Sequence, residues 1–297
     1  MESKKIRPRD VSGNLSRLKS ITTTSKRACR ALIRSGCLAL ACCLALLCSA
    51  GSAYSQTITV YHFNPESHSD RNLVLKNTFD QYFQVSHNIQ LQPVDDRVTF
   101  ERLIEQKPLS LFIMSDWQFR QLEANHADLI PYLRGLKDHN DTFHKLLIGK
   151  APLTTQHATL AVSGTEDYVH SLLQEMTLTT SPLPMEQLRL LTVPKDIDAL
   201  LAVSFGMADA ALATENSYEK YELLYRNEYQ LLKVLGTSQP QKRLVVVLFK
   251  QHLAALEVAL DALIKMDQTP NGQLGLQLLG LDEWTLLPTT RDKGGQP

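Results

Sequence analysis

The hydrophobic and polar positions between residues 57 and 125 predict strands and helices in alternation. Polar and apolar residues alternate in 57–62, and this segment is rich in β-branched side chains, which is typical of a strand. Apolar side chains then recur at helical spacing from Leu73 to Phe83. Further strands are expected at 88–94 and 108–114, and further helices at 99–105 and 117–125. This order predicts an α/β layer fold with a mainly parallel sheet.

The same scheme repeats from residue 158 onward. Strands are expected at 158–162, 188–193, 208–213, 229–235 and 244–249, and helices at 166–176, 196–205, 217–226 and 251–266. Gly206 follows one of these helices at the position where glycine commonly ends a helix. We therefore expect two lobes, 57–148 plus 239–290 and 149–238, joined by a hinge. The cleft between them would be the natural binding site.

The first 53 residues have a different pattern. Basic residues between Lys26 and Arg34 precede an uncharged, mostly apolar run from Ser35 to Cys48, and small residues follow up to Ala53. This arrangement is typical of a secretory signal peptide. The run is shorter than the roughly 20 apolar residues that span a bilayer as a helix. We expect cleavage near Ala53 and a periplasmic mature chain.

Two other interpretations of this segment stay open. The apolar run could be an uncleaved N-terminal anchor, although Arg34 stands in the way of extending it back through Ala31–Ile33. Leu38 to Cys42 loosely resembles the cleavage motif of a lipoprotein, with a poorly fitting Leu40 and a cysteine early in the apolar run.

All five cysteines of the chain lie in the first 53 residues, at positions 29, 37, 42, 43 and 48. The mature chain therefore depends on packing for its stability, because it has no thiol to form a disulfide.

The charge balance changes once this segment is set apart. The whole chain has 31 basic and 31 acidic residues, and residues 1–53 hold 10 of the basic and 2 of the acidic ones. The remaining 244 residues carry 21 basic and 29 acidic side chains, a formal charge of −8. Nucleic acids and anionic membrane surfaces are poor partners for such a chain, because both attract basic surfaces. We expect a soluble monomer.

Three segments carry a resemblance to a known family. Residues 196–214 read DIDALLAVSFGMADAALAT, a helix that ends in Gly-x-Ala-Asp-Ala before a strand. Residues 231–238 read LLKVLGTS before a turn with proline, and residues 269–284 read TPNGQLGLQLLGLDEW. These segments resemble type 2 periplasmic solute-binding proteins, in particular the phosphate/phosphonate-binding branch of ABC transporter substrate-binding proteins. The resemblance implies a two-lobed α/β fold, each lobe a mainly parallel sheet flanked by helices, that closes on a small polar or anionic solute.

Candidate binding residues follow from this fold, because loops at the carboxyl ends of strands line the cleft. The candidates are Tyr61, His62, Asn64, Ser115, Asp116, Trp117, Ser163, Gly164, Thr165, Thr214, Asn216 and Tyr218. Trp117 could stack on a ligand or belong to the core, and Thr214 could bind a ligand or cap the next helix.

Ser163, Gly164 and Thr165 occupy the place where the resemblance implies oxyanion binding. Free N–H groups and the positive end of a helix dipole attract anions. Glu166 and Asp167 follow at once, however, and they would compensate the dipole and repel a phosphonate. The ligand is then less anionic, or the cleft has lost its ancestral ligand and these residues only cap a helix.

No sequence motif indicates catalysis. The chain lacks Gly-x-Ser-x-Gly, His-Glu-x-x-His, a phosphate loop and a Rossmann fingerprint, and its histidines do not have zinc-ligand spacing. We therefore expect no enzyme, no cofactor and no metal. The leading hypothesis is a solute-binding protein for an ABC permease. The alternatives are a sensor or interaction module that acts with a membrane sensor kinase, and an extracytoplasmic hydrolase whose catalytic residues are not evident.

Overall fold

The computed structural model describes residues 57–66, 72–84, 88–153, 158–178 and 188–288. The predicted signal peptide lies outside these residues. Among the described helices, none combines the length and apolar character that a bilayer span requires.

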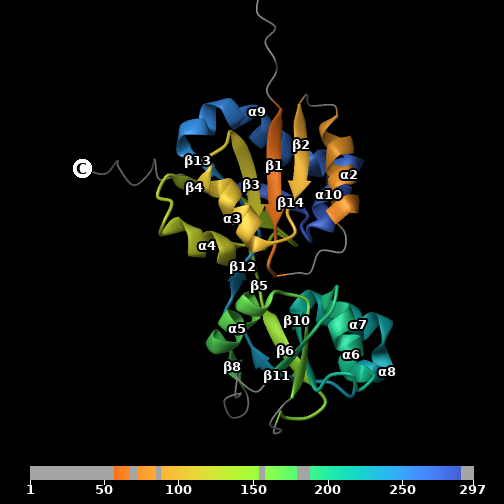
Figure 1. Ribbon diagram of the computed structural model, residues 1–297. Coiled ribbons are helices and arrows are strands. Elements are labelled where there is room, and N and C mark those ends of the chain that lie inside the picture. The colour runs from red at the N-terminus through yellow and green to blue at the C-terminus, as the bar shows by residue number, and fades with distance from the viewer. Residues whose placement is uncertain (1–56, 67–71, 85–87, 154–157, 179–187, 289–297) are drawn as a thin grey trace, which may run out of the picture. The chain divides into compact units, whose positions relative to one another are not determined.

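The first lobe is built on a six-stranded sheet (Figure 1). Its strands, in spatial order, are β14 (Glu283–Leu286), β4 (Leu129–Leu136), β13 (Val245–Phe249), β3 (Ser110–Met114), β1 (Ile58–Phe63) and β2 (Ile89–Pro93). The helices that flank it are α2 (Asn72–Phe83), α3 (Arg97–Glu105), α4 (Asp116–Glu123), α9 (Leu253–Ile264) and α10 (Pro270–Leu278). Short 3₁₀ turns at Lys250–His252 and Lys265–Gln268 border α9.

The second lobe has a six-stranded sheet of its own. Its strands, in spatial order, are β8 (Thr177–Leu178), β11 (Lys233–Thr237), β6 (Lys145–Gly149), β10 (Ala210–Thr214), β7 (Thr159–Val162) and β9 (Arg189–Thr192). Its helices are α5 (Glu166–Glu175), α6 (Asp196–Ser204), α7 (Glu215–Leu224) and α8 (Arg226–Tyr229). Gly206 has a φ of 72° after α6, so it ends that helix as expected.

The chain crosses between the two sheets twice, through a two-stranded ribbon. β5 (Thr142–Phe143) pairs antiparallel with β12 (Gln241–Lys242). β6 follows the first crossing directly and belongs wholly to the second sheet. The predicted lobe boundary between residues 148 and 149 therefore falls inside a strand, and the sheet itself changes near residue 144.

Both sheets are mixed, which corrects the expectation of mainly parallel sheets. In the first sheet β1 is parallel to β2 and β3, but β13 is antiparallel to β3 and β4, and β14 is antiparallel to β4. In the second, β6 is antiparallel to β10 and β11. The reason is the double crossing: a strand that leaves a lobe and one that returns to it run in opposite directions when they pair.

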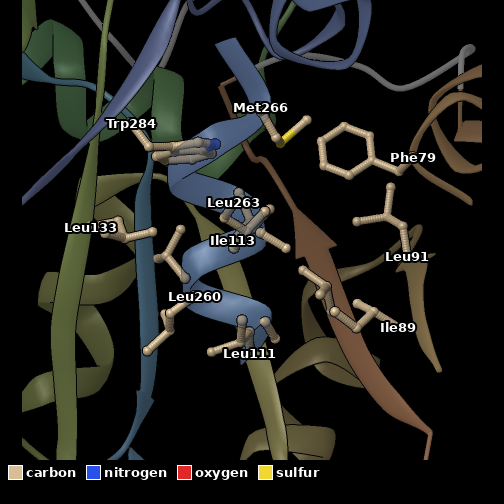
Figure 2. Close-up of a cluster of buried hydrophobic side chains, with 14 of the residues drawn as sticks. Phe79, Ile89, Leu91, Leu111, Ile113, Leu133, Leu260, Leu263, Met266 and Trp284 are labelled. Atoms are coloured by element: carbon tan, nitrogen blue, oxygen red, sulfur yellow. The ribbon is translucent and has the colours of Figure 1, made fainter. Parts of the chain in front are cut away.

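The main core of the first lobe fills the space between its sheet and helices α2, α9 and α10 (Figure 2). Phe79, Ile113, Leu263 and Met266 are fully buried there. Gly272 lets the start of α10 pack closely, because a Cβ at this position would lie 2.1 Å from the Met266 carbonyl oxygen. This contact gives a structural reason for the glycine in the sequence TPNG.

Candidate functional site

A pocket of about 370 Å³ is lined by residues from both lobes. This volume lies at the lower end of the range that small-molecule sites occupy. Its polar and charged lining residues are Asn64, Glu66, Lys137, Lys145, Ser163, Lys195, Asp196, Thr214, Asn216, Ser217, Lys220, Arg243 and Gln277. The apolar part of the lining includes Phe143, Leu244 and Leu281.

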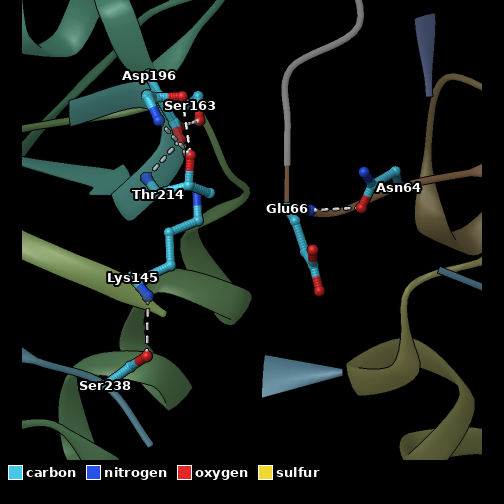
Figure 3. A network of polar contacts seen from close by, with 8 residues as sticks. Asn64, Glu66, Lys145, Ser163, Asp196, Thr214 and Ser238 are labelled. Carbon is cyan, nitrogen blue, oxygen red and sulfur yellow. Dashed lines mark hydrogen bonds and ion pairs between the residues drawn. The ribbon is translucent and has the colours of Figure 1, made fainter. Parts of the chain in front are cut away.

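Two of the lining residues, Lys145 and Asp196, form a hydrogen-bonded ion pair (Figure 3). The Lys145 ammonium, on β6, is 3.1 Å and 3.3 Å from the two carboxylate oxygens of Asp196. The same carboxylate accepts a hydrogen bond from the Ser163 hydroxyl at 2.6 Å and one from the Thr214 backbone N–H at 2.7 Å. Asp196 at the start of α6 therefore connects β6, β10 and the residue that follows β7.

Both charges of this pair are well shielded from water. Only 6% of the Lys145 side chain and 11% of the Asp196 side chain are exposed. Burial by itself would raise the pKa of Asp196, but the Lys145 charge and the hydrogen bonds from Ser163 and Thr214 outweigh it and hold that pKa below its usual value. Asp196 is thus an anion at neutral pH and neutralises Lys145.

The remaining charged groups make the pocket cationic. Lys137, Lys195, Lys220 and Arg243 line it together with the Lys145–Asp196 pair and Glu66. Five cations and two carboxyl groups meet there, a formal charge of +3 when both carboxyl groups are ionised. Lys137 also contacts Asp282 at 3.2 Å, and the Arg243 guanidinium lies over the Phe143 ring at 5.4 Å. Such an excess of positive charge attracts anions.

Glu66 has the most perturbed carboxyl group in the pocket. Burial raises its pKa most strongly, and the nearby Asp116 and Asp196 raise it further, while Lys145 and Arg243 act in the opposite direction. The resulting pKa is about 7, against an ordinary value of 4.5. Glu66 therefore titrates near neutral pH.

The start of α5 is already occupied by the first lobe. The Thr165 N–H donates to the Pro65 carbonyl at 2.8 Å. A Cβ on Gly164 would lie 3.0 Å from the same oxygen, so glycine permits this close approach. The Ser163 hydroxyl is bound to Asp196. The position proposed for an oxyanion thus holds a carbonyl group of the chain itself, and Thr165 is the N-cap residue of α5.

Four predicted binding residues line the pocket: Asn64, Ser163, Thr214 and Asn216. Their role toward a ligand stays a prediction. Thr214 also caps α7, because its hydroxyl oxygen accepts from the Ser217 N–H at 3.2 Å.

Three other predicted residues pack inside their own lobe. The Tyr61 ring stacks on Phe112 at 5.6 Å, and Tyr218 lies against Tyr229 at 4.7 Å. His62 is buried, with one ring nitrogen 3.2 Å from the Ile113 carbonyl oxygen. Burial lowers the pKa of His62 to about 4, against the smaller opposing effect of that contact. None of these three is among the pocket-lining residues.

The residues after β3 have structural partners as well. Ser115 caps α4, since its hydroxyl oxygen accepts from the Gln118 N–H at 3.1 Å, as its place before the helix predicts. Asp116 forms a buried ion pair with Arg134 at 2.5 Å. Trp117 contacts the second lobe: its ring N–H donates to the Ser171 hydroxyl at 3.1 Å.

Sequence reasoning missed the charged groups of the pocket. The charged residues Lys145, Lys195, Lys220, Arg243 and Glu66 are scattered along the chain without a motif. Asp196 was noticed as the start of a helix, not as a pocket residue. One signal was available for Lys145, which begins the strongly apolar strand β6 and needs a counter-charge when buried.

The described residues contain no group of three or more His, Cys, Asp or Glu side chains that could hold a metal ion. The groups that line the pocket form hydrogen bonds and carry charge. The pocket can hold a small polar molecule through ammonium, guanidinium, hydroxyl and amide groups.

Comparison with known proteins yields matches among solved structures. No protein-family model matches the chain, and no curated protein does. PhnD1 from Prochlorococcus marinus, in complex with methylphosphonate, has a TM-score of 0.56 at 10% identity over 80% of this chain and 94% of that chain. The binding protein component of an ABC phosphonate transporter from Pseudomonas aeruginosa has a TM-score of 0.54 at 13% identity over 78% and 82%.

A further match is XAC2383 from Xanthomonas citri bound to ATP, with a TM-score of 0.52 at 12% identity over 80% of this chain and 94% of that one. At such identities the likeness concerns the fold. The chain has the two-lobed α/β fold of type 2 periplasmic binding proteins, of which the phosphonate-binding ABC transporter components are solved examples.

Proposed function

We propose that the chain is a periplasmic solute-binding protein that holds a small anionic solute in the pocket between its lobes. The observation that carries this proposal is the +3 formal charge of the pocket lining. Lys195 and Lys220 are exposed there, and no hydrogen bond or ion pair to a described side chain is found for either. An anionic group of the solute would compensate this charge, in a site where side chains already exclude part of the water.

We further propose that the protein delivers this solute to an ABC permease. The fold supports this, because the phosphonate transporter component from Pseudomonas aeruginosa and the methylphosphonate-bound PhnD1 share it. Oxyanions of phosphorus are accordingly the first solutes to test. The proposal assigns binding, and no catalytic step, to this pocket.

Thermal unfolding with added solute tests the binding. Phosphate, phosphite and methylphosphonate are compared with dimethyl methylphosphonate, a neutral molecule of related shape. A ligand at 100 times its Kd stabilises the folded state by about 2.7 kcal/mol. For a protein of this size we expect an increase in Tm of several degrees with at least one anion and none with the neutral ester.

A matched pair of variants locates the site. Lys220→Met removes a cation of the pocket, whereas Lys250→Met removes an exposed cation that does not line it. The first should weaken binding of the anion, and the second should leave it unchanged. Equal effects of the two variants, or no shift with any anion, would contradict the proposal.

A role as a sensor or interaction module is the second candidate. The Pro65 carbonyl at the start of α5 favours it, because that helix end is then closed to a solute. In this case no anion would shift Tm, and a membrane kinase would copurify with the protein. Neighbouring genes for a permease and an ATPase would favour transport instead.

A further inference from the structure

Exposed apolar side chains are concentrated in one stretch of the second lobe. Among the described residues, twelve large hydrophobic side chains are exposed, and six of these lie between positions 205 and 234. They are Phe205, Met207, Leu223, Leu224, Leu231 and Val234, with exposed fractions from 39% to 84%. Single exposed apolar residues are ordinary on a protein surface, whereas a group of them indicates a contact surface.

Two helices bring part of this group to one place. α6 and α7 lie side by side in the second lobe (Figure 1). They begin at the pocket, near its lining residues Asp196 and Asn216, and run away from it for about 14–15 Å. Near their far ends the hydroxyl groups of Ser204 and Tyr221 lie 2.6 Å apart. The exposed residues that follow α6 and end α7 therefore lie close together, at the helix ends that are farthest from the pocket.

The strands bring the rest of the group to the same end of the second lobe. Ala210 at the start of β10 and Lys233 at the start of β11 both pair with Gly149, on the two sides of β6. Met207 precedes β10 by three residues, and Leu231 precedes β11 by two. Both exposed side chains thus belong to the end of the sheet at which α6 finishes, because β10 runs from there back to the pocket. We call the six exposed residues the apolar end.

Charged side chains of both signs border the apolar end. They are the cations Lys150, Arg226 and Lys233 and the acids Asp209, Glu222 and Glu228, with a formal charge of zero, and we call them the rim. Lys150 donates to the Ser204 carbonyl at 2.9 Å, and the other five lie within three positions of an apolar-end residue in the sequence. In the part of the chain that the structure describes, no rim residue belongs to an ion pair. The rim therefore suits a partner surface that carries charges of both signs.

A second copy of the chain has such a surface. We infer that the apolar end is an interface between two copies of this protein, related by a two-fold axis. In such an interface the same patch meets itself, so the apolar side chains of one copy cover those of the other, and rim cations lie near rim acids of the other copy. The balanced rim matters because the mature chain carries a formal charge of −8, and copies with this charge repel each other elsewhere.

A bilayer surface fits the apolar end less well, because anionic headgroups attract cationic patches and the rim has no net charge. The inferred dimer departs from the sequence-based expectation of a monomer. It also goes beyond the proposed binding function, since the pocket lies at the opposite ends of α6 and α7 and stays outside the interface in each copy.

Sedimentation equilibrium of the mature protein, isolated from the periplasm, tests this interface. With the wild type we expect a reversible dimer whose share rises with concentration. Leu224→Glu places a charge in the apolar end and should raise the Kd of the dimer at least about 10-fold. Val258→Glu is the matched control, because Leu224 on α7 and Val258 on α9 are both 66% exposed. This control should dimerise as the wild type does.

Reversing the rim charges tests the pairing of two identical surfaces. Arg226→Glu with Lys233→Glu leaves one cation and five acids, a formal charge of −4, and Glu222→Lys with Glu228→Lys leaves five cations and one acid, a formal charge of +4. Each double variant should be monomeric by itself, because two identical rims then repel each other, and an equimolar mixture should form a one-to-one dimer. An affinity tag on one of the two variants captures the other only in this mixed dimer.

Several outcomes would overturn the interface. They are a wild type that stays monomeric at every concentration, a dimer that Leu224→Glu leaves intact, and double variants that do not pair when mixed. Cosedimentation of a monomeric wild type with phosphatidylglycerol vesicles would identify a bilayer as the occupant instead. If Leu224→Glu does not fold, the double variants decide. Anion binding is measured on the same samples, and its absence would contradict the proposed function without affecting the dimer.

Discussion

Among single residues, Asp196 carries the largest structural role in the pocket. Its carboxylate compensates the buried Lys145 ammonium and accepts hydrogen bonds from Ser163 and Thr214. Removing one partner of a buried ion pair leaves the other charge buried without compensation. We predict that Asp196→Ala lowers the free energy of unfolding by about 3–5 kcal/mol, measured by urea denaturation at neutral pH.

Asp261→Ala is the control for this prediction. It removes the same carboxylate from a pair with Lys265 at 2.7 Å, in which the side chains are 54% and 60% exposed. Exposed pairs of this kind contribute about 0–1 kcal/mol. Similar losses in the two variants would show that burial does not set the strength of the Lys145–Asp196 pair.

The contrast between buried and exposed charges also explains which site residues could be predicted from the sequence. Asn64, Ser163, Thr214 and Asn216 were predicted from their places after strands, and strand ends do line the pocket. Lys145 and Glu66 were missed because their functional character comes from burial and from neighbours distant in sequence. A hydrophobic pattern places a backbone on an element, but it does not reveal which charged groups that element brings together.

Among the elements, the helices and strands with a regular pattern were predicted well. β1, β2 and β3 and their helices follow the expected order. β4 was missed because Pro131 and Arg134 interrupt its apolar pattern, and Arg134 is in fact buried against Asp116. A strand was expected at 229–235, but α8 ends at Tyr229 and β11 begins at Lys233.

Helix α5 is the element of the second lobe that contacts side chains of the first lobe most directly. Trp117 donates to Ser171 and meets the Tyr168 ring at 5.7 Å. Arg97 lies over the Trp117 ring and pairs with Asp167 at 3.2 Å. We predict that Trp117→Ala costs about 2 kcal/mol of stability, less than a fully buried tryptophan would, and raises the radius of gyration in small-angle scattering.

Ser171→Ala separates packing from hydrogen bonding at this contact. It removes only the acceptor of the Trp117 N–H, so we expect a loss of about 1 kcal/mol and no change in the radius of gyration. If Trp117→Ala left both the stability and the radius of gyration as in the wild type, the contact of α5 with the first lobe would not help to hold the two lobes together.

At the scale of the whole molecule, the repeated α/β pattern was enough to predict two lobes with a double crossing. It could not predict strand direction, because parallel and antiparallel pairing of buried strands depend on where the chain crosses. The ribbon of β5 and β12 shows the consequence: two residues from each crossing pair at the point where the chain changes sheets. Such short segments carry too few positions for a pattern to appear.

Thiol content distinguishes the three interpretations of residues 1–53, because all five cysteines lie at or before position 48. We predict that the protein isolated from the periplasm has no thiol after reduction, since cleavage near Ala53 removes every cysteine. An uncleaved anchor would retain five. A lipoprotein cut before Cys42 would keep Cys42, Cys43 and Cys48, with the first of them acylated and two thiols free. Thiol titration under denaturing conditions, with the intact mass, counts them directly. A count of five or two thiols would contradict the prediction of a secreted protein and indicate an anchored one. The binding site would then work at the membrane surface.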